Sequence, residues 1–275
     1  MLQFNIDQNR CTCCGQCAVD CPLNVITLDE GFPRIRPNRD TACIKCQHCL
    51  AICPTAALSI LGHSPETSRP TLGTFPNADQ LEQLIKGRRS VRHYKPDNLP
   101  ATLIQRLVDV ACHAPTGVNR QQVQFSIIDD RQALVQFREH TYLKLQELIT
   151  AGKLPKKRKR FELFTSLWFD SGIDVLFRNA PHLVVTSAPE TCPTPHQDSL
   201  IALSYFELYA QSLDIGTIWN GLVTWTIDEL VPELQHRLKI PPDNTLGYVM
   251  GFGAPAVNYH RTVEQRTANL VRVTG

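Results

Sequence analysis

Hydrophobic and polar positions follow two different periods along most of the chain. Apolar side chains recur every three or four positions in "DQLEQLIKG" (79–87) and in "PATLIQRLVDVACHA" (100–114), which predicts two amphipathic helices. Gly87 is suited to end the first helix and Pro100 to open the second. In "VQFSIID" (123–129) the period falls to two, and "PHLVVTSA" (181–188) is almost continuously apolar. Both of these segments are predicted to be strands.

The alternation of helical and strand patterns continues to residue 255. "DSLIALSYFELYAQSLD" (198–214) is apolar around much of its circumference, which predicts a helix buried on several sides, as is common in subunit interfaces. "TIDELVPEL" has Thr226 and Glu229 in capping-box spacing, which predicts a helix start. "TLGYVMGFGAP" (245–255) is predicted to be the last strand. Because the strands lack a regular βαβ spacing, the predicted class is α+β.

The first 61 residues differ from the rest because they are rich in cysteine. Nine of the 11 cysteines precede residue 54, and only Cys112 and Cys192 follow it. Residues 62–78 carry prolines, glycines and hydroxyl side chains with no apolar period, which predicts a semi-extended linker. We therefore expect a small domain over 1–61, a linker over 62–78 and a larger domain over 79–275.

Composition limits the classes of function. Hydrophobic residues make up 43% of the 275 residues, enough for a core, and the net charge of +2 favours neither nucleic acid nor a membrane surface as a partner. No apolar run approaches the roughly 20 residues of a membrane span. The first ten residues lack the pattern of a secretory signal, so we expect a cytoplasmic protein. A reducing compartment disfavours disulfides, and the cysteines are better suited to metal binding.

An internal repeat sorts the cysteines. "CTCCGQCAVDCP" (11–22) and "CIKCQHCLAICP" (43–54) both read C-x2-C-x2-C-x3-C-P, at a constant offset of 32 residues. The doubled run resembles that of bacterial two-cluster ferredoxins, over about residues 1–61. The resemblance implies two [4Fe-4S] clusters with crossed ligands: Cys11, Cys14 and Cys17 with Cys53, and Cys43, Cys46 and Cys49 with Cys21. Cys13 falls on Lys45 in the repeat, so we expect it to be a non-ligand.

Other interpretations of the cysteines are less favoured. Structural zinc usually binds two separated pairs of ligands, which this spacing does not provide. Cys112 and Cys192, outside the repeat, are expected to be inert thiols.

Three segments of the larger domain suggest a second cofactor. "GRRSVRHY" (87–94) places three arginines and a serine within five positions, which suits a phosphate, although a solvated basic helix end has the same composition. "APTGVNRQQ" (114–122) is a polar loop between a helix and a strand. "DIGTIWNGL" (214–222) places a tryptophan, an asparagine and a glycine at a strand end.

Together these segments resemble the nitroreductase family of FMN flavoproteins, over about residues 79–270. The resemblance implies a central, mostly antiparallel sheet flanked by helices, and a homodimer with FMN at its interface. It assigns the FMN phosphate to Arg88, Ser90 and Arg92, with Arg89 adjacent and Arg261 completing the site (His260 is the weaker candidate). It assigns the flavin ring to Trp219, Asn220 and Gly221, and to a loop of the other subunit with Pro115, Thr116, Gly117, Asn119 and Gln121. Gln122 and Val123 replace the Pro-Trp usual after this loop.

The two resemblances imply an FMN-dependent oxidoreductase that passes electrons from two [4Fe-4S] clusters to FMN and on to a small electrophile. A nitroaromatic, a quinone or an activated alkene fits that description. Two alternatives remain open: a redox sensor or electron-transfer relay without a dedicated substrate, and an NAD(P)H-driven nitroreductase with the ferredoxin module as a side branch. The electron donor is therefore either ferredoxin or NAD(P)H. No residue stands out as an acid or base, and none is assigned as catalytic.

Three further features carry less weight. "GFGAPA" (251–256) lacks the third glycine of a dinucleotide motif, so we expect no Rossmann site. Trp168 and Phe169 are candidate pocket residues, with core packing the favoured interpretation. The basic run "KLPKKRKR" (153–160) is either an exposed loop or a docking site for an acidic electron carrier.

Overall fold

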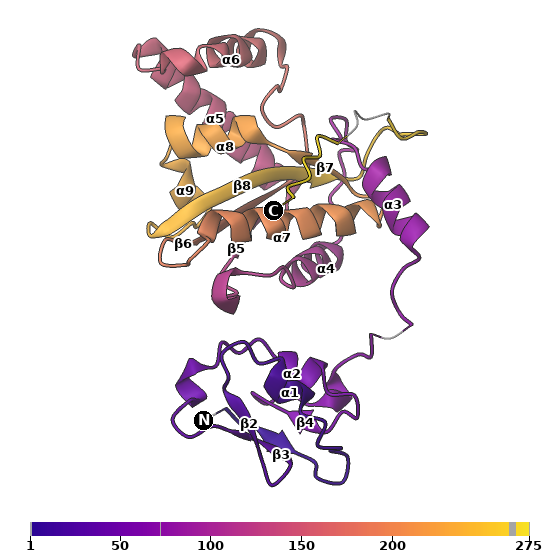
Figure 1. Cartoon of the computed structure of the whole chain (residues 1–275). Coiled ribbons are helices and arrows are strands. Elements are labelled where there is room, and N and C mark those ends of the chain that lie inside the picture. The colour runs from indigo at the N-terminus through magenta and orange to yellow at the C-terminus, as the bar shows by residue number, and fades with distance from the viewer. Residues whose placement is uncertain (1, 72, 264–267, 275) are drawn as a thin grey trace. The chain divides into compact units, whose positions relative to one another are not determined.

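The structure, a computed structural model, describes residues 2–71, 73–263 and 268–274, and the chain divides into two compact units (Figure 1). Unit 1 comprises Met1–Pro76 and Val118–Arg120, and unit 2 comprises Asn77–Gly117 and Gln121–Gly275. Residue 72 of the expected linker lies outside the described residues. Glu66, also in the expected linker, accepts a hydrogen bond from Arg10 at 2.8 Å, so part of that segment is tied to unit 1.

Unit 1 is built from short elements around the cysteine repeats. Strand β1 (Asn5–Ile6) pairs antiparallel with β4 (Leu58–Ser59), and β2 (Ile26–Asp29) pairs antiparallel with β3 (Phe32–Ile35). Each repeat contains one short helix, α1 (Gln16–Val19) or α2 (His48–Ala51), and two 3-10 turns, η1 (Asp40–Ala42) and η2 (Pro65–Thr67), follow the second sheet and the last strand. Apolar side chains of both repeats share one small core with Cys17 and Cys49.

The repeat seen in the sequence is also a repeat of backbone conformation. Residues other than glycine seldom adopt a positive φ, yet equivalent positions of the two halves do so together. The pairs are Cys13 and Lys45 (φ 55° and 58°), Gly15 and Gln47 (73° and 59°), and Asn24 and Ala56 (51° and 53°). The shared positive φ angles at equal spacing indicate that the two cysteine loops have similar local shapes.

Unit 2 contains a four-stranded antiparallel sheet in the order β5-β6-β8-β7. Its strands are β5 (Gln124–Ile128), β6 (His182–Pro189), β7 (Gly216–Trp219) and β8 (Asn244–Gly253). The three predicted strands and the predicted α+β class are confirmed. Strand β6 is buried at almost every position because helices cover both faces of the sheet. Leu183 and Val185 face one core while Val184 faces the other, as expected from the period of two.

The helices of unit 2 lie on both faces of this sheet (Figure 1). Helices α4 (Ala101–Ala111) and α7 (Pro195–Gln211) share one core with the sheet, while α5 (Arg131–Thr150), α6 (Arg160–Ser171) and the segments after β7 share the other. The remaining elements are α3 (Ala78–Gly87), η3 (Gly117–Asn119), η4 (Lys156–Arg158), α8 (Gly221–Trp225), the π-helical turn η5 (Thr226–Leu230) and α9 (Leu234–Arg237). The helices predicted over 79–87, 100–114 and 198–214 are confirmed as α3, α4 and α7.

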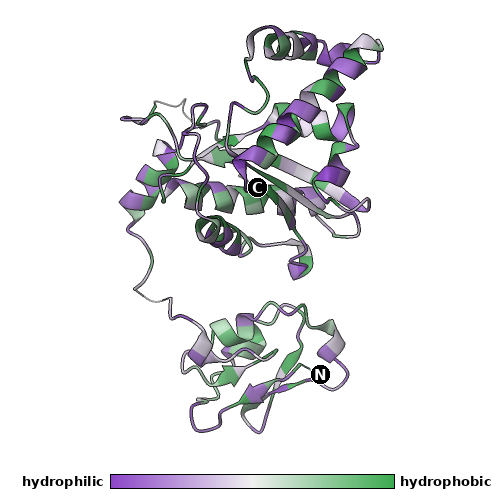
Figure 2. Cartoon of the chain, turned by 180° about the vertical axis from the view of Figure 1, so that it is seen from behind, coloured by the Kyte–Doolittle hydropathy of each residue, from purple (hydrophilic) through white to green (hydrophobic). Residues whose placement is uncertain are grey.

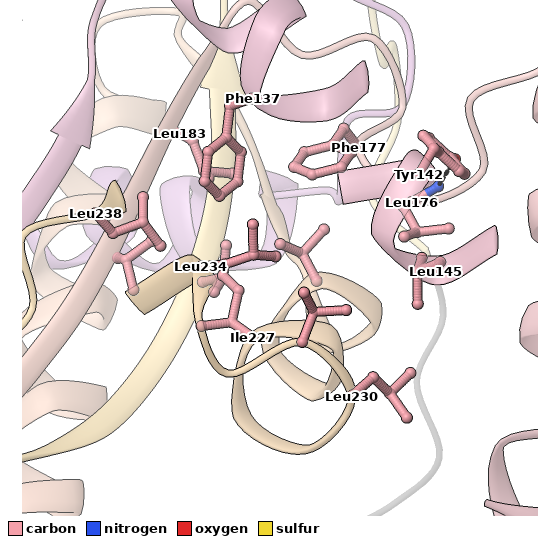
Figure 3. Close-up of a cluster of buried hydrophobic side chains, with 14 of the residues drawn as sticks. Phe137, Tyr142, Leu145, Leu176, Phe177, Leu183, Ile227, Leu230, Leu234 and Leu238 are labelled. Carbon is pink, nitrogen blue, oxygen red and sulfur yellow. Dashed lines mark hydrogen bonds between the residues drawn. The ribbon is translucent and has the colours of Figure 1, made fainter. Parts of the chain in front are cut away.

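The larger core lies between α5, α6 and the segment 222–240. Figure 3 shows Phe137, Phe177 and Leu183 beside Ile227, Leu234 and Leu238. Hydrophilic and hydrophobic bands alternate along the helices of unit 2 in Figure 2, which is typical of helices that bury one side. In the described part of the chain, no helix combines the length and apolar character needed to span a bilayer.

One helix start predicted from the sequence changes in the structure. The predicted helix start at Thr226 is wrong: its Oγ1 donates to the carbonyl of Leu222 at 2.8 Å inside a helical segment that continues from α8. The cap is Asn220, whose side-chain oxygen accepts from the backbone N–H of Val223 at 3.1 Å. Asparagine is among the best N-cap residues, and here it begins the helix six residues earlier.

Trp168 is half-buried and packs against the larger core, in agreement with the favoured interpretation. Its ring stacks on Tyr142 with centroids 4.5 Å apart and planes 2° from parallel. Core packing is wrong for Phe169, the next residue on α6, which is 40% exposed because it points away from this core.

The buried His182 at the start of β6 is expected to make stability depend on pH. Its Nε2 accepts the backbone N–H of Leu99 at 2.9 Å, and its ring packs 5.1 Å from Phe252. Burial lowers the pKa of His182, although Asp129 and Asp130 oppose the shift. Because the pKa is lower in the folded chain, the unfolded chain binds the proton more readily. The stability contributed by neutral His182 is complete above the unfolded pKa of about 6.5 and is lost as the pH falls toward the folded pKa.

We therefore expect His182→Gln, which retains an acceptor for Leu99, to flatten the stability profile below about pH 6.5. The wild-type slope from this one group can reach about 1.4 kcal/mol per pH unit. Denaturant unfolding followed by tryptophan fluorescence measures the effect. His113→Gln, at an exposed histidine, is the control and should keep the wild-type profile. Equal slopes for the wild type and His182→Gln would contradict this role.

Candidate functional site

The arginine-rich segment 88–92 runs beside β7, the strand that ends in Trp219. Ser90 forms a parallel bridge with Thr217, and the N–H of Val91 donates to the carbonyl of Thr217 at 2.8 Å. A Cβ atom at Gly216 would lie 2.7 Å from the side chain of Val91, so the close approach of the two segments requires glycine there. The fold thereby brings the predicted phosphate residues next to the strand that carries the predicted ring contacts.

The chain after β8 lies against the same arginine-rich segment. The N–H of Lys95 donates to the carbonyl of Ala254 at 2.8 Å, and the N–H of Ala256 donates to that of His93 at 2.9 Å. The hydroxyl of Tyr259 reaches the carbonyl of Ser90 at 3.3 Å. His260 and Arg261 follow directly and are exposed. Three segments far apart in the sequence thus meet at one end of the sheet.

The three arginines of the segment have different surroundings. One Nη of Arg88 donates to Glu207 at 3.0 Å, and one of Arg92 donates to the carbonyl of Ser90 at 3.2 Å. Arg89 donates through Nη2 to the carbonyl of Lys86 at 2.5 Å. Its Nε, however, is buried with no hydrogen-bond partner in the described part of the chain. A buried donor without an acceptor is costly, so an anionic oxygen at this position fits the residues present.

The strand end at residues 219–221 is fixed by the side chain of Asn220. Its Nδ2 donates to the carbonyl of Leu176 at 2.8 Å, while its Oδ1 caps α8. Both polar ends of the Asn220 side chain are therefore engaged within the fold. Trp219 packs edge-on against Tyr248 at 5.3 Å, and a Cβ at Gly221 would lie 2.9 Å from the Tyr248 hydroxyl. Tyr248 was not singled out in the sequence, and nothing in its local pattern marks it.

The loop 115–121 is held against the start of α7. The N–H of Gly117 donates to Oδ1 of Asp198 at 3.0 Å, and Thr194 donates to the same oxygen at 2.8 Å. Inside the loop, the N–H of Gln121 donates to Oγ1 of Thr116 at 2.9 Å. A Cβ at Gly117 would lie 2.3 Å from Oγ1 of Thr194, so glycine is required. Asn119 and Gln121 adopt positive φ angles of 52° and 50°, and Pro115 precedes this turn. Sequence reasoning missed Asp198 and Thr194.

In unit 1 the eight cysteines of the repeat gather around two cavities. One is lined by Cys11, Cys14, Cys17 and Cys53, with Cys13 also at its wall. The other is lined by Cys21, Cys43, Cys46 and Cys49. The structure therefore brings together the same two crossed sets that the repeat implies. Across the described residues, no three His, Cys, Asp or Glu side chains are grouped to hold a single metal ion.

Backbone N–H groups point at the sulfur atoms of these cavities. Sγ of Cys21 accepts from the N–H of Val25 at 3.3 Å, and Sγ of Cys53 accepts from that of Ala57 at 3.2 Å. The two donors are 32 residues apart in the sequence, and so are the two acceptors. Hydrogen bonds to sulfur are one means by which proteins tune iron–sulfur clusters, so the donor set fits such a group.

The pKa values of two buried or half-buried cysteines shift in opposite directions. Burial raises the pKa of Cys49 to about 12, although the N–H of Leu50 opposes the shift. Burial also acts on Cys53, but hydrogen bonds from the backbone of Ala57 and from Thr55 outweigh it and lower the pKa of Cys53. A metal deprotonates a coordinating thiol outright, so a buried thiol such as Cys49 is compatible with ligation.

Two residues of the basic run 153–160 have partners within unit 2. Arg158 binds both carboxylate oxygens of Glu229, at 3.1 and 2.6 Å, and Lys157 binds Glu229 at 2.9 Å. The guanidinium of Arg158 lies 3.9 Å from the ring centroid of Trp225, a cation–π contact. The run is thus partly a structural element of this unit.

Comparisons with known proteins place these features in context. The model of the nitroreductase family matches residues 85–254. The nitroreductase NfnB of Mycolicibacterium smegmatis is 28% identical over 182 residues, which cover 57% of this chain and 75% of that protein. A ferredoxin-like protein from the nif region of Sinorhizobium fredii is 36% identical over 56 residues, which cover 19% of this chain and 88% of that protein.

Solved structures agree on the fold of the larger part. A nitroreductase with bound FMN from Bacteroides fragilis has a TM-score of 0.57 at 22% identity, covering 72% of this chain and all of that chain. One from Desulfitobacterium hafniense has a TM-score of 0.54 at 22% identity, covering 70% and 96%. The family model spans more than half of the 275 residues. This chain belongs to the nitroreductase family, a family of FMN-dependent oxidoreductases.

Proposed function

We propose that this protein is an FMN-dependent reductase whose electrons arrive through two [4Fe-4S] clusters bound by its own N-terminal unit. The carrying observation is that each crossed set of four cysteines lines one cavity, in a chain whose larger part belongs to the nitroreductase family. The similarity of 56 residues of this chain to a ferredoxin-like protein supports the same assignment. The acceptor we propose is a flat electrophile such as a nitroaromatic, a quinone or an activated alkene.

The residues proposed to hold the FMN phosphate are Arg88, Arg89, Ser90 and Arg92, with Arg261 from the chain after β8. Arginine forks form strong charge-assisted hydrogen bonds with phosphate. The orphaned Nε of Arg89 supports this assignment because a phosphate oxygen would satisfy it. Trp219 and Gly221 are proposed to border the flavin ring, while Asn220 fixes the strand end that presents them.

We propose a homodimer in which the loop with Pro115, Thr116, Gly117, Asn119 and Gln121 lines the flavin of the other subunit. Two observations on unit 2 support it. The loop is hydrogen-bonded to the start of α7, whereas the arginine segment 88–92 lies beside β7. The two parts of the proposed FMN site thus belong to different elements of one chain. The apolar stripe of α3 is exposed in the part of the chain that the structure describes, where Leu81 and Ile85 are 43% and 51% exposed. A second subunit would bury that stripe.

Bound FMN would supply the capacity to collect single electrons and deliver them in pairs to an organic acceptor. The protein's own tasks are to bind the phosphate, orient the ring at the end of β7 and hold the acceptor against it. Trp219 and Tyr248 supply an aromatic edge beside that strand end. No side chain there is assigned as an acid or base, so the proton is proposed to come from solvent.

A second candidate function is an NAD(P)H-driven nitroreductase, with the clusters as a side branch. A relative from Methanothermobacter thermautotrophicus, described as a putative NADH dehydrogenase/NAD(P)H nitroreductase, favours it: it is 26% identical over 187 residues, covering 68% of this chain and 82% of that protein. A redox relay without a substrate of its own is the remaining alternative.

Anaerobically prepared protein tests the proposal directly. We expect about one FMN, about eight irons and about eight sulfides per chain, and a dimeric mass by light scattering. Reduced ferredoxin should bleach the flavin absorbance quickly and NADH slowly. Fast bleaching by NADH alone would overturn the proposed direction of electron flow, and a monomer with stoichiometric FMN would overturn the shared site.

A further inference from the structure

Glu207 is a charged residue in the buried part of α7. It is 7% exposed, and its helix neighbours Leu203, Phe206 and Ala210 are fully buried. A carboxylate in such surroundings is strongly unfavourable unless it is paired and hydrogen-bonded. The position of Glu207 therefore calls for specific partners.

Those partners belong to the segment proposed to bind phosphate. Oε1 of Glu207 accepts from Nη1 of Arg88 at 3.0 Å and from Oγ1 of Thr217 at 3.2 Å. Thr217 is also the bridge partner of Ser90, and its carbonyl accepts the N–H of Val91. One carboxylate oxygen thus joins α7 to β7 and to the arginine segment.

We propose that Glu207 is a positioning residue for the FMN phosphate, acting through Arg88. A guanidinium carries five N–H donors in a rigid plane, and Glu207 takes one of them. This hydrogen bond fixes the plane of Arg88, whose side chain is 29% exposed, and leaves its other donors available for a phosphate. The inference deepens the proposed function and rests on FMN being the cofactor.

Two effects of Glu207 on phosphate binding have opposite signs. Its negative charge repels a phosphate, so neutralising it would strengthen binding if charge alone mattered. Its hydrogen bond with Arg88 restricts the motion of that side chain before FMN binds. Weakening this hydrogen bond therefore reduces the affinity for FMN. Positioning therefore predicts weaker binding after Glu207→Gln, whereas simple charge repulsion predicts tighter binding.

The test compares FMN with riboflavin, which lacks the phosphate, on flavin-free full-length protein. Glu207→Gln keeps an acceptor for Arg88 but removes the charge that strengthens the hydrogen bond. We expect it to raise the Kd of FMN about ten-fold and to leave that of riboflavin unchanged. Glu207→Asp keeps the charge but withdraws the carboxylate, and it should give the same FMN-selective loss. Asp170→Asn removes an exposed charge on α6, away from the arginine segment in the sequence, and should change neither Kd.

A double-variant cycle shows whether Glu207 acts through Arg88. In an Arg88→Met background, which already lacks the guanidinium, Glu207→Gln should weaken FMN binding no further. Unchanged or tighter FMN binding by Glu207→Gln, or an equal loss for FMN and riboflavin, overturns the inference. A wild-type protein that binds neither flavin would overturn the proposed function itself, and this inference with it.

Discussion

Replacing Asp174 with asparagine is expected to lower the unfolding free energy of unit 2 by about 3–5 kcal/mol. The Asp174 side chain is completely buried, and its Oδ2 lies 3.1 Å from Nε of Arg138, which is itself buried. Asparagine keeps the shape of the residue but removes its charge. The guanidinium of Arg138 is then left in the core without a counter-ion, and that accounts for most of the loss.

Asp174 also organises the loop that precedes β6. Its Oδ1 accepts from the Tyr142 hydroxyl at 3.0 Å and from the N–H of Phe177 at 2.9 Å, and its Oδ2 accepts from the N–H of Asn179 at 2.8 Å. Burial raises the pKa of Tyr142, which keeps the phenol protonated as the donor. Leu176 of the same loop holds Asn220, so disorder here would reach the strand end proposed to border FMN.

Tryptophan fluorescence measures the loss selectively, because all three tryptophans belong to unit 2. Urea unfolding of flavin-free protein gives the free energy from the midpoint and slope. Glu147→Gln is the matched control, since it breaks the exposed pair with Lys144 and should cost less than about 1 kcal/mol. A loss no larger for Asp174→Asn than for Glu147→Gln would refute the dominant role of the buried pair.

The second large effect is expected from two neighbouring cysteines with opposite outcomes. Cys14→Ser should reduce the iron content from about eight to about four per chain, because it removes a ligand of one [4Fe-4S] cluster. Cys13→Ser should leave the iron content unchanged. Both residues lie at the wall of the same cavity, so position alone does not separate them.

The repeat is what separates Cys13 from Cys14. Cys14 has the counterpart Cys46 in the second cavity, whereas Cys13 corresponds to Lys45, with which it shares a positive φ. A Cβ at Gly31 would lie 3.5 Å from Sγ of Cys13, so this side chain extends toward the β2–β3 turn. Iron and sulfide analysis of both variants under anaerobic conditions is the measurement. Loss of a cluster in Cys13→Ser would show that Cys13 is a ligand and that the repeat misassigns it.

Local patterns predicted the elements of unit 2 well. The stripes of α3, α4 and α7, the alternation in β5 and the apolar runs of β6 and β8 all match observed elements. The capping box at Thr226 failed because Asn220 offered a competing cap upstream, and the strand end before it decided which one begins the helix. Short cap motifs occur by chance inside helices, and only packing selects among them.

The residues of the candidate site also fall into two groups, those that the sequence indicated and those that only the fold revealed. Its arginines, its loop and its cysteines could be named from the sequence because each group is contiguous or repeated. Glu207, Asp198 and Tyr248 could not, since a single polar residue in an apolar helix or strand has no local signature of its partner. The bond from Arg88 to Glu207 spans 119 positions of the chain.

The sequence by itself therefore determined the cysteine repeat and the change in composition that divides the chain into two parts, while its resemblances implied the pairing of the cysteines and the segments proposed to hold FMN. The repeat and the composition depend only on the order of the residues, whatever backbone the chain adopts. Only the tertiary structure decided which buried charges are paired, which residue caps α8 and which side chain holds Arg88. The physical reason is that a buried polar group takes its partner from whatever surface packs against it, and that surface comes from distant parts of the chain.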